Sequence, residues 1–131
     1  MGILDGEEKI FENFIFEMAT IGPQAHKLGV NLKMHILQPG RKQPPHGPRV
    51  KFFTKGMETS GFSISLNEDP QKIRLVAGDY MAFLTESQFN ALLEKVRKYR
   101  IPFLNMWNDP EMTQDELIEQ MQDVDAGRKV I

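Results

Sequence analysis

The segment from Pro39 to Arg49 is the stretch of the sequence best suited to hold reactive side chains in place. Its eleven residues include four prolines, two glycines, one histidine and three cations, which are Arg41, Lys42 and Arg49. Proline removes backbone freedom, so the segment is predicted to be a stiff connection that fixes His46 in space. That imidazole could act as a general acid or base, or contact an anion together with the neighbouring cations. The alternative is a turn whose prolines prevent strand aggregation.

A second group of polar side chains follows the alternation of the strands expected around this segment. Successive residues of a strand point to opposite faces of a sheet, so every second residue shares a face. The alternation predicts one cationic, hydroxyl-bearing face with a single aromatic ring, formed by Lys33, His35, Arg49, Lys51, Phe53, Ser63, Ser65 and Arg74. Such a face can bind phosphate or carboxylate groups, and an exposed ring can stack on a nucleic-acid base. Lysine on strands also prevents edge pairing, which is the alternative explanation.

The sequence favours neither a metal centre nor a nucleophilic enzyme. It has no cysteine, which excludes disulfides, thiolate metal sites and thiol catalysis. His26, His35 and His46 share no short ligand spacing, although the last two flank one turn and could meet near Asp79. Phosphate-binding glycine loops, dinucleotide fingerprints and nucleophile elbows are absent from the sequence. We therefore predict no metal and no cofactor.

The elements that must position these residues are strands in the middle of the chain and helices at its ends. Four segments alternate apolar and polar residues between connections rich in glycine, proline and asparagine, namely 31–37, 49–54, 61–66 and 72–77. This pattern predicts an antiparallel meander of four to five strands with one apolar and one polar face. Helical periodicity covers Glu7 to Thr20, and Gly22-Pro23 is expected to stop that helix.

Two further helices are expected after the strands. Capping-box patterns at Thr85 and Thr113 each precede a stripe of apolar residues at helical spacing, with a short run from Phe103 to Trp107 between them. The fold class is thus α+β, with one domain over residues 1–131, the helices on the apolar face of the sheet, and a frayed tail over 126–131.

Composition and charge describe an ordinary domain with an uneven charge distribution. The chain has 131 residues and a net charge of -2, but residues 21–60 carry seven bases and one acid while residues 108–131 carry two bases and seven acids. A basic middle can bind anions, or the acidic ends can fold over it. The first capped helix ends in a basic cluster formed by Lys95, Arg97, Lys98 and Arg100. Cations at the C-terminal end of a helix interact favourably with the helix dipole, and we prefer this structural explanation of the cluster to a nucleic-acid-binding patch. No apolar run reaches the ~20 residues of a membrane span, and the start lacks a secretory signal, so we expect a cytoplasmic protein.

Two resemblances centre on the proline-rich segment. The first is carried by the motif Pro44-Pro45-His46 at the entry to a strand, a β-rich middle, an amphipathic helix and the closing motif Leu104-Asn105-Met106-Trp107. In these features the sequence resembles a group of small bacterial domains of unknown function. This resemblance covers about Leu32 to Leu117 and implies an α+β fold and a role for His46, Arg49 and Trp107, but no activity.

The second resemblance is to the front half of a cupin barrel. It is carried by Pro39-Gly40, by Pro44-Pro45-His46 and by the run from Leu75 to Tyr80. In cupins the histidine at this place is a metal ligand, and a second histidine follows two positions later. Pro48 stands at that place in this sequence, so the resemblance implies no metal site here.

Three hypotheses about function follow. The first is a binding or interaction module that recognises an anionic partner, either a protein acid patch or a nucleic acid, through the 39–49 segment and the polar sheet face. The second is a small hydrolase or phosphoryl-transfer enzyme in which His46 is the acid or base and Arg49 or Lys51 stabilises negative charge. The third is an assembly subunit or homodimer with an apolar patch, whose candidate residues are Phe16, Met106, Trp107 and Met112. A membrane partner is not expected.

Overall fold

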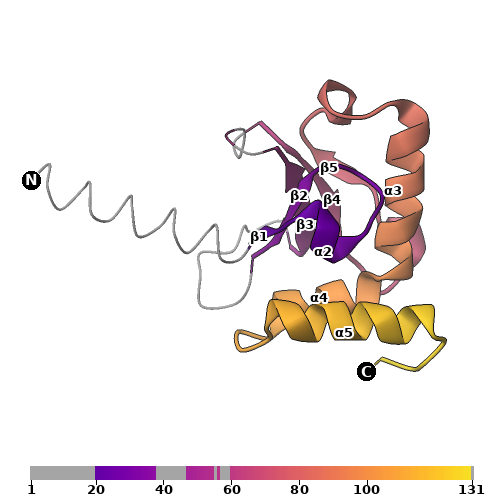
Figure 1. Ribbon diagram of the computed structural model, residues 1–131. Coiled ribbons are helices and arrows are strands. Elements are labelled where there is room, and N and C mark those ends of the chain that lie inside the picture. The colour runs from indigo at the N-terminus through magenta and orange to yellow at the C-terminus, as the bar shows by residue number, and fades with distance from the viewer. Residues whose placement is uncertain (1–19, 38–46, 55, 57–59, 131) are drawn as a thin grey trace, which may run out of the picture.

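The computed structural model describes residues 20–37, 47–54, 56 and 60–130 (Figure 1). Within these ranges the fold is α+β, as predicted: an antiparallel sheet in the middle of the chain is followed by helices. The predicted helix from Glu7 lies outside the described residues, as do Arg41, Lys42, His46 and Phe16. In the described part, no helix is both long enough and apolar enough to span a bilayer.

The sheet has five strands in the order of the chain, so that each strand pairs with the next. These are β1 (Thr20–Ile21), β2 (Lys33–Ile36), β3 (Arg49–Phe53), β4 (Phe62–Ser65) and β5 (Leu75–Ala77). Four of them lie inside the predicted segments, which confirms the meander. The expectation that a helix extends to Thr20 is wrong, because Thr20 and Ile21 pair with β2.

The dipeptide Gly22-Pro23 begins a helix instead of ending one, which corrects a second expectation. Gly22 is the N-cap, with extended backbone (ψ 165°), and Pro23 is the first residue of the short helix α2 (Pro23–His26). Proline suits this position because its fixed φ is helical and the N–H it lacks would have no partner in the helix. Lys27 then ends α2 in the left-handed conformation, with φ 55°.

Three helices follow the sheet, where the sequence predicted two. They are α3 (Glu86–Lys98), α4 (Arg100–Asn108) and α5 (Gln114–Asp125), and both predicted capping boxes, at Thr85 and Thr113, are formed. The run expected to be a connection is most of α4. Pro102 is compatible with this helix because it lies in the first turn, where backbone N–H groups have no helical acceptor.

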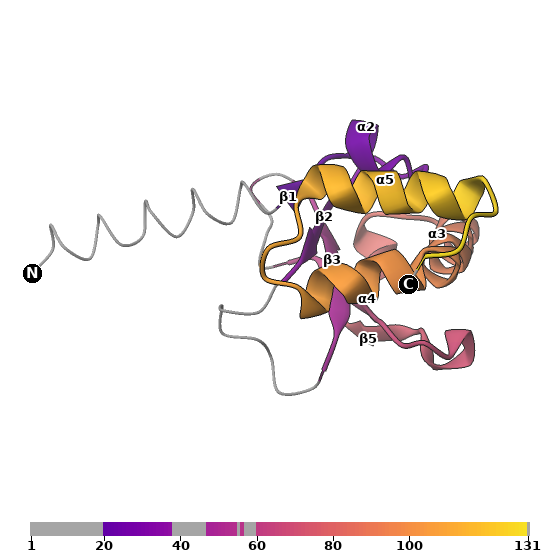
Figure 2. The ribbon, with the colours of Figure 1, turned by 90° about the horizontal axis from the view of Figure 1, so that it is seen from below.

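The apolar face of the sheet packs against these helices and forms the core. Phe62 stacks on Phe52 with ring centroids 5.6 Å apart and meets Phe89 of α3 edge-on at 6.0 Å. Figure 1 shows α3 beside the sheet, and Figures 1 and 2 show α4 and α5 lying side by side across one end of it. The buried core continues into these helices through Leu92, Phe103, Trp107 and Leu117.

Short connections tie the last strand to this core. Ser65 Oγ donates to Lys72 O at 2.8 Å and accepts from Arg74 N–H at 3.0 Å, which fixes the chain as it enters β5. Two short 3-10 turns flank β5, with η1 (Pro70–Lys72) before the strand and η2 (Tyr80–Ala82) after it. Gly78, directly after β5, has φ +80° and passes so close to β4 that a Cβ there would lie 2.3 Å from Gly61 O.

This close approach gives a stability prediction. Gly78→Ala and Gly127→Ala both place a side chain at positive φ, which costs about 1 kcal/mol. A Cβ at Gly127 would have no atom within 4 Å, whereas the one at Gly78 overlaps backbone. We expect Gly78→Ala to lower the free energy of unfolding by at least about 2 kcal/mol more than Gly127→Ala, measured by urea denaturation. Equal losses in the two variants would contradict the close packing of β5 on β4.

Candidate anion-binding face

The strand register brings the predicted polar side chains onto one face of the sheet. Across β2 and β3, Lys33 pairs with Phe53 and His35 pairs with Lys51. Across β3 and β4, Lys51 pairs with Ser63 and Arg49 pairs with Ser65. Paired residues in antiparallel strands share a face, and so do residues two positions apart. The face therefore gathers its cationic side chains from β2 and β3 and its hydroxyl groups from β4.

Arg74 lies at the border of this face. The N–H of Ser65 donates to Arg74 O at 2.9 Å, in the step of the ladder next to the Ile64–Leu75 pair. Since Ile64 and Leu75 belong to the apolar side, Arg74 shares the polar side with Ser65. The Arg74 side chain is exposed.

The centre of the face is more buried than the sequence suggested. Phe53 is 1% exposed, Ser63 6% and His35 8%, so the expectation of an exposed aromatic ring is wrong. Alternation alone predicts which face a side chain joins, but not how much of that face other parts of the molecule cover. The accessible polar atoms belong to half-buried residues around this centre, namely Lys33, Arg49, Lys51 and Ser65.

Arg49 is a half-buried cation on this face that has lost part of its ordinary solvation. Its Nε is buried and has no hydrogen-bond acceptor in the described part of the chain, and burial lowers the pKa of its guanidinium. A buried N–H without an acceptor is costly, and a charged acceptor satisfies it best. The strands themselves supply no carboxylate, because β2, β3, β4 and β5 contain no aspartate or glutamate.

The rest of the predicted site falls outside the described residues. Arg41, Lys42 and His46 lie there, so a meeting of His46 with His35 or Asp79 stays a prediction. Among the residues described, no group of three or more histidine, aspartate or glutamate side chains could hold a metal ion. The groove at the described end of this segment, about 610 Å³ and bordered by Pro48, Leu66 and Leu104, has Glu68 as the one charged side chain in its described lining.

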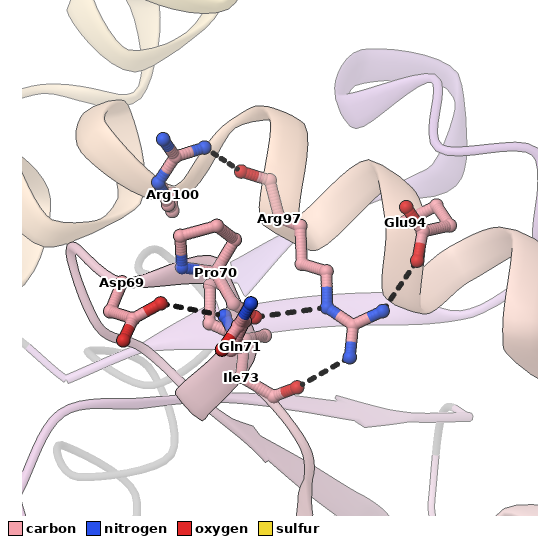
Figure 3. Close-up of polar contacts among 7 residues, drawn as sticks. All are labelled: Asp69, Pro70, Gln71, Ile73, Glu94, Arg97 and Arg100. Carbon is pink, nitrogen blue, oxygen red and sulfur yellow. Dashed lines mark hydrogen bonds and ion pairs between the residues drawn. The ribbon is translucent and has the colours of Figure 1, made fainter.

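The basic cluster at the end of α3 serves the fold. Arg97 Nε donates to Pro70 O at 3.0 Å and its Nη2 to Ile73 O at 3.1 Å (Figure 3). Arg100 Nε donates to Glu68 O at 2.8 Å, and Lys95 Nζ to Leu28 O at 3.0 Å. These cations hold connections of the sheet against the helices.

The C-terminal end of α5 is tied to α3 in the same way. Asp125 Oδ1 accepts from Tyr99 Oη at 2.6 Å and from Lys98 Nζ at 2.7 Å. The hydrogen bonds from these two groups hold the pKa of the Asp125 carboxyl below its usual value. The tail after Asp125, expected to fray, folds back as far as Arg128, whose Nε donates to Asp123 Oδ1 at 2.7 Å. Every cation of the Lys95–Arg100 cluster thus has a partner within the molecule, which favours the structural explanation of the cluster.

His26 is likewise structural. It is 2% exposed, its Nε2 lies 2.7 Å from Leu32 O, and its Nδ1 accepts the N–H of Leu28 at 3.0 Å. A ring that accepts at Nδ1 and donates at Nε2 is neutral. Burial lowers the pKa of His26, against the smaller raising effect of its bond to Leu32.

The expectation of an exposed apolar patch for assembly is wrong for the three candidate residues that the structure describes. Met106 is 3% exposed, Met112 5% and Trp107 6%, because α4 and the turn after it pack these side chains into the core. Among the described residues, the large hydrophobic side chains that are exposed are Val76 (40%) and Met81 (71%), on and after β5. Sequence reasoning missed both, since their positions look like an ordinary strand and turn.

Comparisons with known proteins identify no relative. Models of protein families, curated proteins and solved structures all give no match to this chain.

The buried, neutral His26 ring predicts that the stability of the protein depends on pH. A histidine whose pKa is lower in the folded than in the unfolded state binds fewer protons when folded, so stability is complete above the unfolded pKa of about 6.5 and is lost as pH falls below it. We expect the free energy of unfolding, measured in urea, to decrease between pH 7.5 and about pH 5. His26→Gln, which offers both an acceptor and a donor, should weaken this decrease. An unchanged pH profile in His26→Gln would show that other groups cause it.

Proposed function

We propose that the protein is a binding module that recognises an anionic partner through the polar face of its sheet. The observation that carries the proposal is Arg49, a half-buried cation whose buried Nε has no acceptor in the described part of the chain. An oxygen of a bound carboxylate or phosphate would satisfy this donor and would be attracted by the charge.

The neighbouring charges support an anion over a neutral ligand. Lys33 and Lys51 share the face with Arg49, the exposed Arg74 lies at its border, and the strands carry no acidic residue. Arg41, Lys42 and His46 would extend the same surface along the 39–49 segment, in keeping with the excess of six positive charges over residues 21–60 (seven bases less one acid).

An acidic protein segment fits this surface better than single-stranded nucleic acid. Binding of single strands usually relies on exposed aromatic rings that stack on bases. Phe53, the ring of this face, is 1% exposed, and the basic cluster of α3 is already engaged within the molecule. Phosphate groups remain a chemistry that the cations can bind. The hydrolase alternative depends on His46, and no observation among the described residues favours it.

Fluorescence anisotropy with three labelled or competing probes tests the proposal: a polyglutamate peptide, a single-stranded oligothymidylate and inorganic phosphate. We expect the peptide to bind at low salt and to weaken as salt rises. Arg49→Gln should weaken binding about tenfold or more, because charged hydrogen bonds contribute roughly 1.5–3 kcal/mol. Lys129→Gln, an exposed cation on the C-terminal tail, is the matched control and should change affinity little.

Each outcome has a definite meaning. Binding of the oligonucleotide with higher affinity than the peptide would replace the acidic segment with nucleic acid as the partner. Equal affinity of the two variants would remove Arg49 from the site, and absence of binding to every probe at low salt would overturn the proposal.

A further inference from the structure

The first strand of the sheet begins at the end of the sheet where Arg49 lies. The register places Thr20 opposite His35, and His35 opposite Lys51, so these three residues form one row across β1, β2 and β3 and share the polar face. Both pairings are antiparallel, so β1 and β3 run in the same direction. Arg49 precedes Lys51 by two residues on β3. The start of β1 and Arg49 therefore belong to the same end of the polar face.

The distance between these two places is short. Neighbouring strands lie about 4.8 Å apart and each residue advances a strand by about 3.3 Å, so the Cα atoms of Thr20 and Arg49 are about 12 Å apart across two strand spacings and two residues. Glu17 stands three residues before Thr20. Three residues can span about 10 Å, and the long side chains of glutamate and arginine cover the remainder. The Glu17 carboxylate can thus reach the Arg49 guanidinium without any change in the sheet.

The chain before β1 has the charge of the partner that the polar face is proposed to bind. Residues 1–19 carry one basic side chain, Lys9, and five acidic ones, a net charge of -4. A ligand tethered this close to its site acts at a high effective concentration, so it needs little intrinsic affinity to occupy the site. Arg49 offers a buried Nε donor with no acceptor in the described part of the chain. The five acids are Asp5, Glu7, Glu8, Glu12 and Glu17.

We propose that the acidic segment 1–19 is an internal ligand of the polar face, in which the Glu17 carboxylate accepts the Nε–H of Arg49. This inference rests on the proposed function, because it assigns an occupant to the same site. An external acidic partner then has to displace the segment, so the intact chain binds it more weakly than the face alone would. The segment thereby sets how acidic a partner must be in order to bind.

Fluorescence anisotropy with the labelled polyglutamate peptide tests the competition. Glu17→Ala should bind the peptide about threefold more tightly than the wild-type protein at low salt, because the internal carboxylate no longer competes. Glu119→Ala removes the same charge from an exposed position on α5 and is the matched control, with the affinity of the wild type. In an Arg49→Gln background, Glu17→Ala should change the affinity little, because the contact that it removes is already lost.

Nuclear magnetic resonance tests the contact itself without any added ligand. The Nε–H signal of Arg49 is assigned by its loss in Arg49→Gln. It should shift in Glu17→Ala, where the carboxylate acceptor is gone, and stay in place in Glu119→Ala. Backbone amide spectra of the same samples check that each variant folds.

The two measurements separate this inference from the proposed function. If the peptide binds, and Glu17→Ala changes neither its affinity nor the Arg49 signal, the internal ligand is wrong and the anion-binding face stands. If the Arg49 signal shifts in Glu17→Ala while neither this variant nor the wild type binds the peptide at low salt, the contact exists and the proposed function is wrong. An equal gain of affinity in the Arg49→Gln background, or an equal shift of the signal in Glu119→Ala, would also overturn the contact.

Discussion

The pairing register of β2, β3 and β4 is the constraint on which the rest of the molecule depends. Together the three strands point five side chains toward the helices, where they are completely buried: Met34 of β2, Val50 and Phe52 of β3, and Phe62 and Ile64 of β4. A shift of one residue would turn them all to the opposite face, so burial of the core fixes the register strongly. The same register assembles Lys33, Arg49 and Lys51 on the other face. The candidate site is thus a consequence of the packing of the core, and it needs no loop to be positioned.

The connections are held by a different interaction, from cationic side chains to backbone carbonyl groups. Arg97 reaches the segment between β4 and β5 (Figure 3). Arg100 reaches the same segment through Glu68 O, and Lys95 reaches the segment after α2 through Leu28 O. A carbonyl oxygen in an irregular segment needs a donor, and a long side chain from a helix end can supply one without a second element of secondary structure. This explains why a cluster with the composition of a nucleic-acid patch is part of the framework, and why β5 keeps a defined position although it is short.

Much of the fold could be predicted from the sequence, and the reasons for the errors are physical. Alternation gave four strands and capping boxes gave α3 and α5, because both patterns are local. β1 and α4 were missed because their formation depends on tertiary context: Thr20 and Ile21 are extended only as partners of β2, and Pro102 is acceptable only because α4 begins at Arg100. Membership of the polar face was predicted from alternation, but the burial of Phe53 and His35 depends on what covers the sheet, which no short pattern encodes. The contribution of the 39–49 segment stays a prediction.

The presence or absence of a hydrogen-bond acceptor is the reason why we assign different roles to Arg49 and to the cluster of α3, although both are cationic. The cations of the cluster have carbonyl or carboxylate oxygens within hydrogen-bond distance, and these bonds hold the fold together. Arg49 is partly withdrawn from water by its neighbours on the sheet, and its buried Nε has no such oxygen among the described residues. Folding alone gains nothing from that arrangement, because the same strand position could hold an apolar residue without loss of a hydrogen bond. A partly desolvated guanidinium with an unsatisfied Nε gains when an external anion supplies the missing oxygen, and this gain is the physical basis for the recognition surface that we propose on the sheet.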